Sequence, residues 1–289
     1  MAKIVVTGTS KGIGLTTALT LARAGHTVYA TMRNPGRAPE LAETAAKEGL
    51  PMHVLAMDVD SDESVTAGFA AIAAQAGEID VLVNNAGIAR GGSTEELPMA
   101  DFRAVMETNY FGALRCIKEV IPQMRKRRSG VIINVTSVAG KLSTTPFAAY
   151  AASKFALEAL SESLAQEMKL FDVHVAIVEP GVIDTPMANE IEPPIAPNLY
   201  PGQRRMAHYF AAILRNPTSP LLVAETIQNI IESGTWQLRH PVGPEAGPTL
   251  AGRIATSDEN HIAVHALADD NTWYDIMEKH TGMKIRSEN

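Results

Sequence analysis

Residues 4–14, which read IVVTGTSKGIG, decide the fold of this 289-residue chain. A β-branched apolar run leads into a glycine-rich turn, and helical spacing begins at Gly14. Glycine lets the backbone turn tightly and approach a ligand closely, and a helix start offers unpaired N–H groups to a pyrophosphate. The stretch therefore predicts a strand, a turn and a helix that bind a dinucleotide. Its spacing is G-x3-G-x-G rather than the common G-x-G-x-x-G, so a plain structural turn is the alternative.

Short apolar runs and longer helical patterns alternate through the first 185 residues. Strands that alternate with helices form right-handed βαβ units, and strands without a polar face belong to a sheet covered on both sides. We therefore expect an α/β fold: a single Rossmann-type domain with a doubly wound parallel sheet and helices on both faces. Strands are expected at Lys3–Thr7, Thr27–Thr31, Met52–Met57, Val81–Val83, Val131–Val135 and Val173–Val178. Helices are expected at Gly14–Ala24, Pro39–Glu48, Asp62–Ala76, Asp101–Met124, Ala148–Lys169 and Leu221–Ser233.

The composition and periodicity of the sequence change after Pro186. Residues 187–203 are rich in Pro and Asn, a short apolar run follows at Trp236–Leu238, and residues 240–289 have no clear periodicity. We expect residues 1–185 to form the cofactor-binding and catalytic core. Residues 186–289 are expected to form a substrate loop, a helix and a C-terminal extension.

The segment Met187–Phe210 is expected to cover the substrate, as loops over such sites often do. A surface excursion packed by its own side chains is the alternative. The side chains that favour an apolar or aromatic ligand are Met187, Ile191, Ile195, Leu199 and Tyr200.

The formal net charge of −7 disfavours a broad nucleic-acid surface, which needs clustered Lys and Arg. The basic run 125–128 is expected to be a solvated loop.

The single cysteine, Cys116, has apolar neighbours at helical spacing, which favours a packing role over a nucleophilic one. A chain with one cysteine cannot form an internal disulfide, so we expect an intracellular protein. No apolar run is long enough to span a bilayer and no signal peptide precedes the first strand, so we expect no membrane partner and a cytoplasmic location. Scattered His26, His53 and His174 lack ligand spacing, and we expect no metal site.

The end of the second predicted strand selects the cofactor. Many NAD sites carry an acid here that binds the ribose 2′-hydroxyl, but this chain has Met32 followed by Arg33. Arg33, helped by Lys11 in the glycine turn, is placed to pair with a 2′-phosphate, so NADP(H) is favoured over NAD(H). Solvated loop charges are the alternative. After the third strand, Asp58 and Val59 either hold the adenine edge, or Asp58 caps the next helix.

Tyr150 and Lys154 have i,i+4 spacing in a strong helical stretch, which places both on one helix face. An unperturbed phenol has a pKa of about 10. An ammonium about 4 Å away lowers it by up to about 3 units, toward the pH at which a general acid/base works best. This spacing is common in helices, so by itself it does not indicate a catalytic pair. Ser137 at the end of the preceding strand makes the catalytic interpretation stronger, because its hydroxyl could hold a substrate oxygen. Residues 84–87 (NNAG) follow the fourth strand at the same edge, and Asn109 is an amide in an apolar helix that needs partners.

In this order, these motifs resemble the short-chain dehydrogenase/reductase family over about the first 185 residues, including Pro180-Gly181-x-x-x-Thr185. The resemblance implies that Tyr150 is the acid/base, that Lys154 binds the nicotinamide ribose and lowers the pKa of Tyr150, and that Ser137 orients the substrate oxygen. It also implies that Asn109 supports a water chain behind Lys154. Residues 28–33 look like those of NADP-preferring, hydroxysteroid-dehydrogenase-like members. The residues expected to bind the cofactor are Gly8, Ser10, Lys11, Gly12, Ile13, Gly14, Arg33, Asp58, Val59, Asn85, Ala86, Gly87, Tyr150, Lys154, Pro180, Gly181, Val182 and Thr185.

The sequence therefore predicts an NADP(H)-dependent oxidoreductase that interconverts a ketone or aldehyde and an alcohol by hydride transfer. The expected partner is a small apolar or aromatic carbonyl or alcohol compound, with no nucleic acid. The resemblance further implies a homodimer or homotetramer formed through helices 101–124 and 148–169. Two alternatives are a catalytically silent NADP(H)-sensing protein and a nucleotide-sugar epimerase or dehydratase, which also uses a Tyr–Lys pair.

Overall fold

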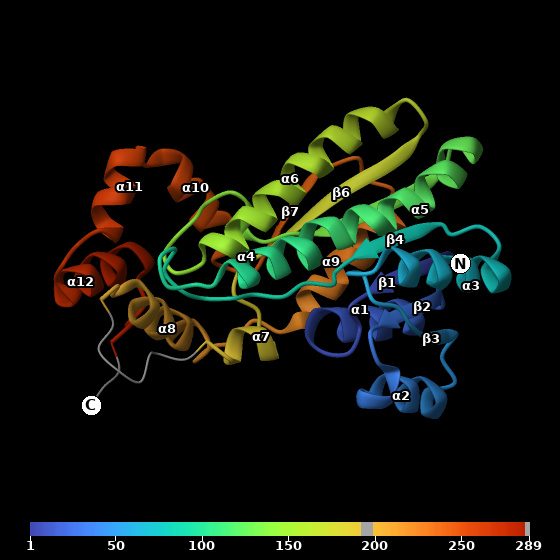
Figure 1. The fold of residues 1–289 in the computed structure, drawn as a ribbon, viewed down its shortest axis with the longest axis horizontal. Helices are drawn as coiled ribbons and strands as arrows, with labels where there is room; N and C mark the ends of the chain where they lie inside the picture. The colour runs from blue at the N-terminus through green and yellow to red at the C-terminus, as the bar shows by residue number, and fades with distance from the viewer. Residues whose placement is uncertain (192–198, 287–289) are drawn as a thin grey trace.

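A parallel sheet forms the centre of the computed structural model, which describes residues 1–191 and 199–286 (Figure 1). Within these residues the sheet has seven strands in the order β3-β2-β1-β4-β5-β6-β7. The strands are β1 (Lys3–Thr7), β2 (Thr27–Met32), β3 (Met52–Ala56), β4 (Val81–Asn84), β5 (Gly130–Val135), β6 (Val173–Pro180) and β7 (Arg239–Val242). Because β1 pairs with both β2 and β4, the winding direction reverses between β1 and β4. The expected fold class, a doubly wound α/β sheet, is confirmed.

Helices cover both faces of the sheet. One face packs against α1 (Gly12–Arg23), α2 (Glu40–Glu48) and α9 (Pro220–Ser233), and the other against α3 (Asp62–Ala76), α5 (Gly112–Arg127) and α6 (Ala148–Lys169). Successive β1 residues alternate between the two cores: Ile4 and Val6 belong to one, Val5 to the other, and all three are fully buried. Each such side chain contributes about 1.5–3 kcal/mol by burial, which explains why the strands have no polar face.

The predicted helix Asp101–Met124 is wrong in its continuity. The backbone forms α4 (Met99–Met106), a π turn at Glu107–Phe111, and then α5. A π turn inserts an extra residue into a helix and often marks a functional site. The periodicity of the apolar residues does not reveal it.

The basic run 125–128 is not a solvated loop. Its first three residues form the last turn of α5, where positive charge favours the helix dipole, and Arg128 caps the helix in the left-handed conformation. Arg127 Nη2 donates to the carbonyl of Ile79 at 2.5 Å, and Arg128 pairs with Asp172 at 2.6 Å. By contrast, Cys116 is buried in α5 and its pKa is raised to about 12 by burial, which confirms a packing role.

The C-terminal third contains more order than its sequence predicts. Its further helices are α7 (Pro186–Asn189), α8 (Gly202–Ile213), α10 (Ala246–Ala255), α11 (Asp258–His265) and α12 (Asp270–Thr281). The short apolar run Trp236–Leu238 is not part of a strand; the seventh strand begins at the next residue, Arg239. Figure 1 shows α8, α11 and α12 together at one end of the molecule. Arg205 of α8 holds this lobe together: it is only 2 % exposed, its Nε lies 2.8 Å from Asp270 Oδ1, and its guanidinium lies 5.7 Å from the Trp273 ring centroid. These contacts are distant in sequence, so local periodicity cannot predict them.

Gly14 offers a test of how closely the glycine turn packs on α1. A Cβ at this position would lie 2.3 Å from the carbonyl oxygen of Gly8 and 2.4 Å from Asn85 Nδ2. We expect Gly14→Ala to lower the free energy of unfolding by about 1–3 kcal/mol, because the contacting backbone cannot move away. Gly247→Ala is the matched control, since nothing lies within 4 Å of its Cβ on α10. Denaturant titration should show the control unchanged or more stable; equal losses in both variants would contradict this packing.

Candidate active site

A cavity of about 1900 Å³ opens along the carboxyl ends of the central strands. Open α/β sheets bind ligands at this edge, beside the point where the winding reverses. Every residue expected to bind the cofactor lines the cavity, as does Ser137. Asn109 does not line it; this residue is 1 % exposed and lies behind Gly87, whose Cβ would be 3.3 Å from Asn109 Oδ1.

The glycine turn is held open by the loop after β4. Gly8 and Gly12 have φ angles of +71° and +59°, which L side chains rarely adopt. The hydroxyl of Thr7 accepts hydrogen bonds from the backbone N–H groups of Asn85 and Ala86, both at 3.0 Å. In return, Asn85 Nδ2 donates to the carbonyls of Thr7 at 2.9 Å and Gly8 at 3.1 Å. The Asn85 amide therefore shapes the cradle for a dinucleotide, although sequence reasoning placed it among the direct cofactor contacts.

The end of β2 presents an exposed cation. Arg33 lines the cavity, and in the described part of the chain its guanidinium makes no hydrogen bond or ion pair. Lys11 Nζ lies 3.4 Å from Glu190 Oε1 in an exposed pair at the end of α7. Such surface pairs contribute only about 0–1 kcal/mol, so a phosphate can replace Glu190 as the partner of Lys11. Both cations are placed as the sequence predicts, at the same cavity.

Asp58 does not cap the helix that follows it. The cap of α3 is Ser61, whose hydroxyl accepts from the N–H of Ser64. Asp58 Oδ1 instead accepts from the N–H of Asp60 at 3.2 Å. The capping alternative is wrong, and the role of Asp58 and Val59 toward an adenine stays a prediction.

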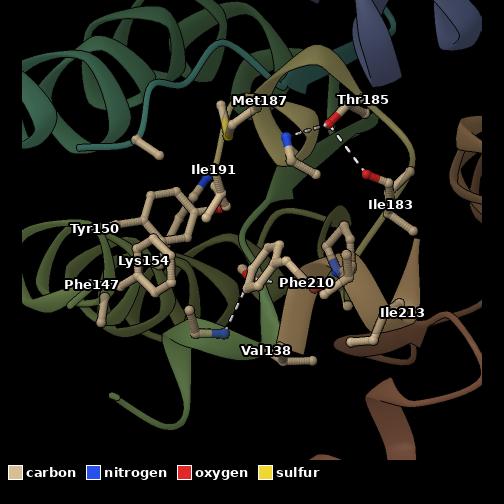
Figure 2. A pocket seen from close by; sticks show the side chains of 18 of the residues that line it. Val138, Phe147, Tyr150, Lys154, Ile183, Thr185, Met187, Ile191, Phe210 and Ile213 are labelled. Carbon is tan, nitrogen blue, oxygen red and sulfur yellow. Dashed lines mark hydrogen bonds between the residues drawn. The ribbon is translucent and has the colours of Figure 1, made fainter. Parts of the chain in front are cut away.

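Ser137, Tyr150 and Lys154 converge where the cofactor cleft meets the rest of the cavity. Ser137 is 8 % exposed; its Oγ accepts from the N–H of Ala139 at 3.1 Å and donates to the carbonyl of Pro180 at 3.3 Å. The first two turns of α6 carry the other two residues. Lys154 Nζ donates to the carbonyl of Val135 at 2.9 Å and lies 5.7 Å from the centroid of the Tyr150 ring. Figure 2 shows the Tyr150 ring facing the cavity with Lys154 behind it.

The electrostatics of this group correct one sequence-based expectation. Burial raises the pKa of the Tyr150 phenol, and its interaction with the Ser137 hydroxyl lowers the pKa only in part. Burial also lowers the pKa of Lys154 to about 8, against the opposing charge of Glu158. The raised pKa of Tyr150 is opposite to the expectation that Lys154 brings it toward 7, because burial disfavours the phenolate. The Tyr150 phenol is therefore protonated at neutral pH.

The π turn places Asn109 between the loop after β4 and helix α6. Its Oδ1 accepts from the N–H of Ile88 at 2.8 Å, while its Nδ2 donates to the carbonyl of Ile88 and to Ser153 Oγ, both at 2.9 Å. The buried amide is satisfied as the sequence requires, and it ties the loop after β4 to α6. Its implied role in a water chain stays a prediction.

At the opposite wall, Glu245 contacts the segment that the resemblance assigns to the nicotinamide. Its Oε1 accepts from the N–H of Val182 at 2.5 Å, and a Cβ on Gly181 would lie 2.2 Å from the same oxygen. Thr185 caps α7 through the N–H of Ala188 at 3.4 Å (Figure 2). Sequence reasoning missed Glu245, which lies 63 residues after Val182 in a segment without periodicity.

Beyond Tyr150 the cavity becomes an apolar chamber (Figure 2). Met187 and Ile191 line it, as expected, but Leu199 is 81 % exposed and neither it nor Tyr200 lines the cavity. Ile195 lies outside the described residues. Met206 and Phe210 of α8 also line the cavity, and both lie in or at the end of the segment Met187–Phe210 that was expected to cover the substrate. The sequence did not predict the contribution of η3 (Val138–Gly140) or α11. The apolar lining includes Val138, Leu142, Phe147, Ile183, Met206, Phe210, Ile213 and Val264.

Two further kinds of site are absent from residues 1–191 and 199–286. None of the helices in these ranges is long and apolar enough to cross a membrane. None of their His, Cys, Asp and Glu side chains form a group of three or more that could hold a metal ion.

Comparison with known proteins identifies the family. The sequence model of the short chain dehydrogenase family matches residues 2–196. Retinol dehydrogenase 8 from Bos taurus is 38 % identical over 263 residues, which cover 86 % of this chain and 83 % of the relative. The crystal structure of a short-chain dehydrogenase from Streptomyces avermitilis has a TM-score of 0.77 at 32 % identity, over 91 % of this chain and 94 % of that one. A variant of actinorhodin polyketide ketoreductase, solved with NADPH, has a TM-score of 0.75 at 28 % identity, over 85 % and 97 % of the two chains. The chain is therefore an oxidoreductase of the short-chain dehydrogenase/reductase family, which acts on alcohol and carbonyl groups.

Proposed function

We propose that this protein uses NADP(H) to interconvert a bulky apolar ketone or aldehyde and its alcohol, with Tyr150 as the general acid/base. The observation that carries the proposal is the position of Ser137, Tyr150 and Lys154, at the junction of the nucleotide cradle and the apolar chamber. The cradle fits a dinucleotide, since the close approach of Gly8 and Gly14 to the loop after β4 leaves no space for a Cβ.

In the reductive direction, Tyr150 donates its proton to the carbonyl oxygen. Ser137 Oγ holds that oxygen, because the hydroxyl can exchange its weak 3.3 Å bond to Pro180 for a bond to the substrate. Lys154, held by the Val135 carbonyl, stabilises the phenolate that remains. The chemistry supplied by a bound nicotinamide is hydride transfer to or from the adjacent carbon. In the oxidative direction, the phenolate takes the proton back from the alcohol.

The proposed preference for NADP(H) rests on Arg33. Its guanidinium, which has no hydrogen bond or ion pair within residues 1–191 and 199–286, can form a bidentate contact with a 2′-phosphate. Met32 stands where an acid would repel that phosphate. The binding of NADPH by the related ketoreductase supports the same cofactor here.

The proposed substrate class rests on the chamber. Aromatic and aliphatic side chains from η3, α6 and α8 form most of its wall near Tyr150. Retinol, after which the bovine relative is named, is a bulky apolar alcohol of the kind that such a wall accommodates. Turnover of such compounds would separate this proposal from a silent NADP(H)-sensing protein and from a nucleotide-sugar epimerase or dehydratase.

A homodimer or homotetramer stays a prediction, supported by exposed Phe111 and Phe155 on the segments expected to pair. The cytoplasmic location also stays a prediction.

The first prediction concerns turnover. With NADPH, a panel of ketones should show consumption of NADPH that increases with the apolar size of the substrate. Tyr150→Phe should reduce kcat by at least about 100-fold because it removes the proton donor, while the Kd for NADPH stays within a few-fold of wild type. Tyr110→Phe, the same change outside the cavity, should retain full activity. Wild-type turnover by Tyr150→Phe would contradict the assignment.

The second prediction concerns the choice of cofactor. Arg33→Ala should weaken NADPH binding by about 10- to 100-fold, which corresponds to the roughly 1.5–3 kcal/mol of a charge-assisted hydrogen bond, and should leave NADH binding unchanged. Arg37→Ala removes a neighbouring exposed arginine that does not line the cavity, and serves as the control. Fluorescence titration with both cofactors measures the effect. Equal losses for NADPH and NADH would exclude the proposed contact.

The third prediction concerns pH. The Lys154 ammonium is present below its pKa of about 8 and is lost above it. Because Tyr150 has a raised pKa and stays protonated in this range, the reductive kcat/KM for NADPH should fall as pH rises through about 8, by about tenfold per pH unit. A profile that is flat to pH 10 would show that the charge of Lys154 is not required.

A further inference from the structure

A buried ionic group lies directly behind the catalytic residues. This group consists of Glu158, Glu179 and Arg239. Glu158 follows Lys154 by one turn on α6 and is 3 % exposed, and Glu179 immediately precedes Pro180 on β6 and is 1 % exposed. Arg239 begins β7. The two carboxylates do not line the large cavity, so neither contacts a substrate or cofactor there.

Glu158 bonds to the residue that precedes Ser137. Thr136 Oγ1 lies 2.7 Å from Glu158 Oε1 and 3.1 Å from the carbonyl oxygen of Val178, and donates to the carboxylate at the shorter distance. The Thr136 N–H donates to the same Val178 carbonyl at 2.8 Å. The turn after Ser137 also packs on this carboxylate side chain, because a Cβ on Gly140 would lie 2.8 Å from Glu158 Cγ. Glu158 thus contacts the backbone segment of Ser137 on both sides while it belongs to the helix that carries Tyr150 and Lys154.

Within the described residues, Glu158 is the acidic group whose charge acts on Lys154. Arg239 Nε lies 3.0 Å from Glu158 Oε2 and 3.9 Å from Glu179 Oε1. Within the described residues Glu179 Oε1 has no hydrogen-bond partner, and burial together with Glu158 raises the pKa of Glu179 to about 7. Lys141 Nζ lies 3.9 Å from Glu158 Oε2. The charge of Glu158 opposes the burial that lowers the pKa of Lys154.

Among residues 1–191 and 199–286, the other groups that contact Lys154 or lie beside it are uncharged or cationic. They are the phenol of Tyr150 on the same helix, the carbonyl of Val135 from β5, and the amide of Asn109 behind Gly87. Arg239 and Lys141, on the far side of Glu158, are cations.

Stability alone does not explain a buried carboxylate at this position. Replacement of a buried ion pair by packed apolar residues is often neutral or stabilising by about 1–4 kcal/mol, because desolvation offsets the attraction. We propose that Glu158 is a positioning residue of the active site: its bond to Thr136 orients Ser137, and its charge keeps Lys154 an ammonium. This inference rests on the roles proposed above for Ser137, Tyr150 and Lys154.

Two substitutions separate the two actions. Glu158→Gln keeps an oxygen for Thr136 but removes the charge, so the fall of reductive kcat/KM on the alkaline side should move down by about half a pH unit or more. Thr136→Val keeps the charge but removes the hydroxyl, so kcat should fall about tenfold through loss of orientation while the alkaline fall stays in place. Neither change should alter the Kd for NADPH by more than a few-fold.

Glu162→Gln is the matched control. Glu162 is exposed on the same helix and pairs with the same guanidinium, at 2.5 Å from Arg239 Nη2, but does not contact Thr136. Its pH profile and kcat should match those of wild type. Circular dichroism and thermal unfolding identify any variant that fails to fold. If Glu158→Gln does not fold, Thr136→Val still tests the proposal, because it only replaces one hydroxyl by a methyl group.

Two outcomes would overturn the proposal. One is a Glu158→Gln profile that coincides with wild type, which shows that the charge does not act on Lys154. The other is a Thr136→Val variant with full kcat, which shows that the bond does not orient Ser137. Failure of the underlying catalytic roles is recognised separately, by turnover in Tyr150→Phe.

Discussion

The contact between the glycine turn and the loop after β4 is the constraint on which the site depends. Strands β1 and β4 are neighbours at the reversal of winding, so their carboxyl ends leave two loops side by side. The Thr7 hydroxyl and the Asn85 amide join these loops through four hydrogen bonds, at 3.0, 3.0, 2.9 and 3.1 Å. Gly8 and Gly14 allow the approach because neither has a Cβ. The cradle is therefore set by a polar contact inside a largely apolar scaffold.

Further hydrogen bonds at the same edge of the sheet connect the cradle to the proposed catalytic residues. Asn109 connects the loop after β4 to α6 through Ile88 and Ser153. Ser137 connects β5 to the end of β6 through the carbonyl of Pro180. Each connection uses a buried polar side chain whose hydrogen bonds are satisfied, because an unsatisfied one would cost about 1–3 kcal/mol. A helix and three strand ends are thereby held in one arrangement before a ligand binds.

Burial gives this arrangement its acid–base character. Desolvation disfavours both the phenolate of Tyr150 and the ammonium of Lys154, so it raises the pKa of the first and lowers the pKa of the second. The phenol is thus protonated at neutral pH, as the proposed carbonyl reduction requires, while the charge of Lys154 depends on the groups around it. Glu158 is the buried anion on that side, and Glu245 lies at the opposite wall against Gly181. Neither has a local sequence pattern that predicts its role.

The sequence by itself determined six of the seven strands described, the helices that cover both faces of the sheet, and the residues that line the cradle and meet around Tyr150. Apolar strands alternate with helical patterns along the chain, glycines mark the turn, and Tyr150 and Lys154 share one helix face, so these features are local or follow from chain order. Only the tertiary structure decided the π turn around Asn109, the helical lobe built on Arg205, the position of Glu245, and the direction of the Tyr150 pKa. Each of these depends on contacts between segments far apart in the chain, or on how much water the fold removes from a group. Neither long-range contacts nor desolvation produce a periodic pattern of residues from which they could be predicted.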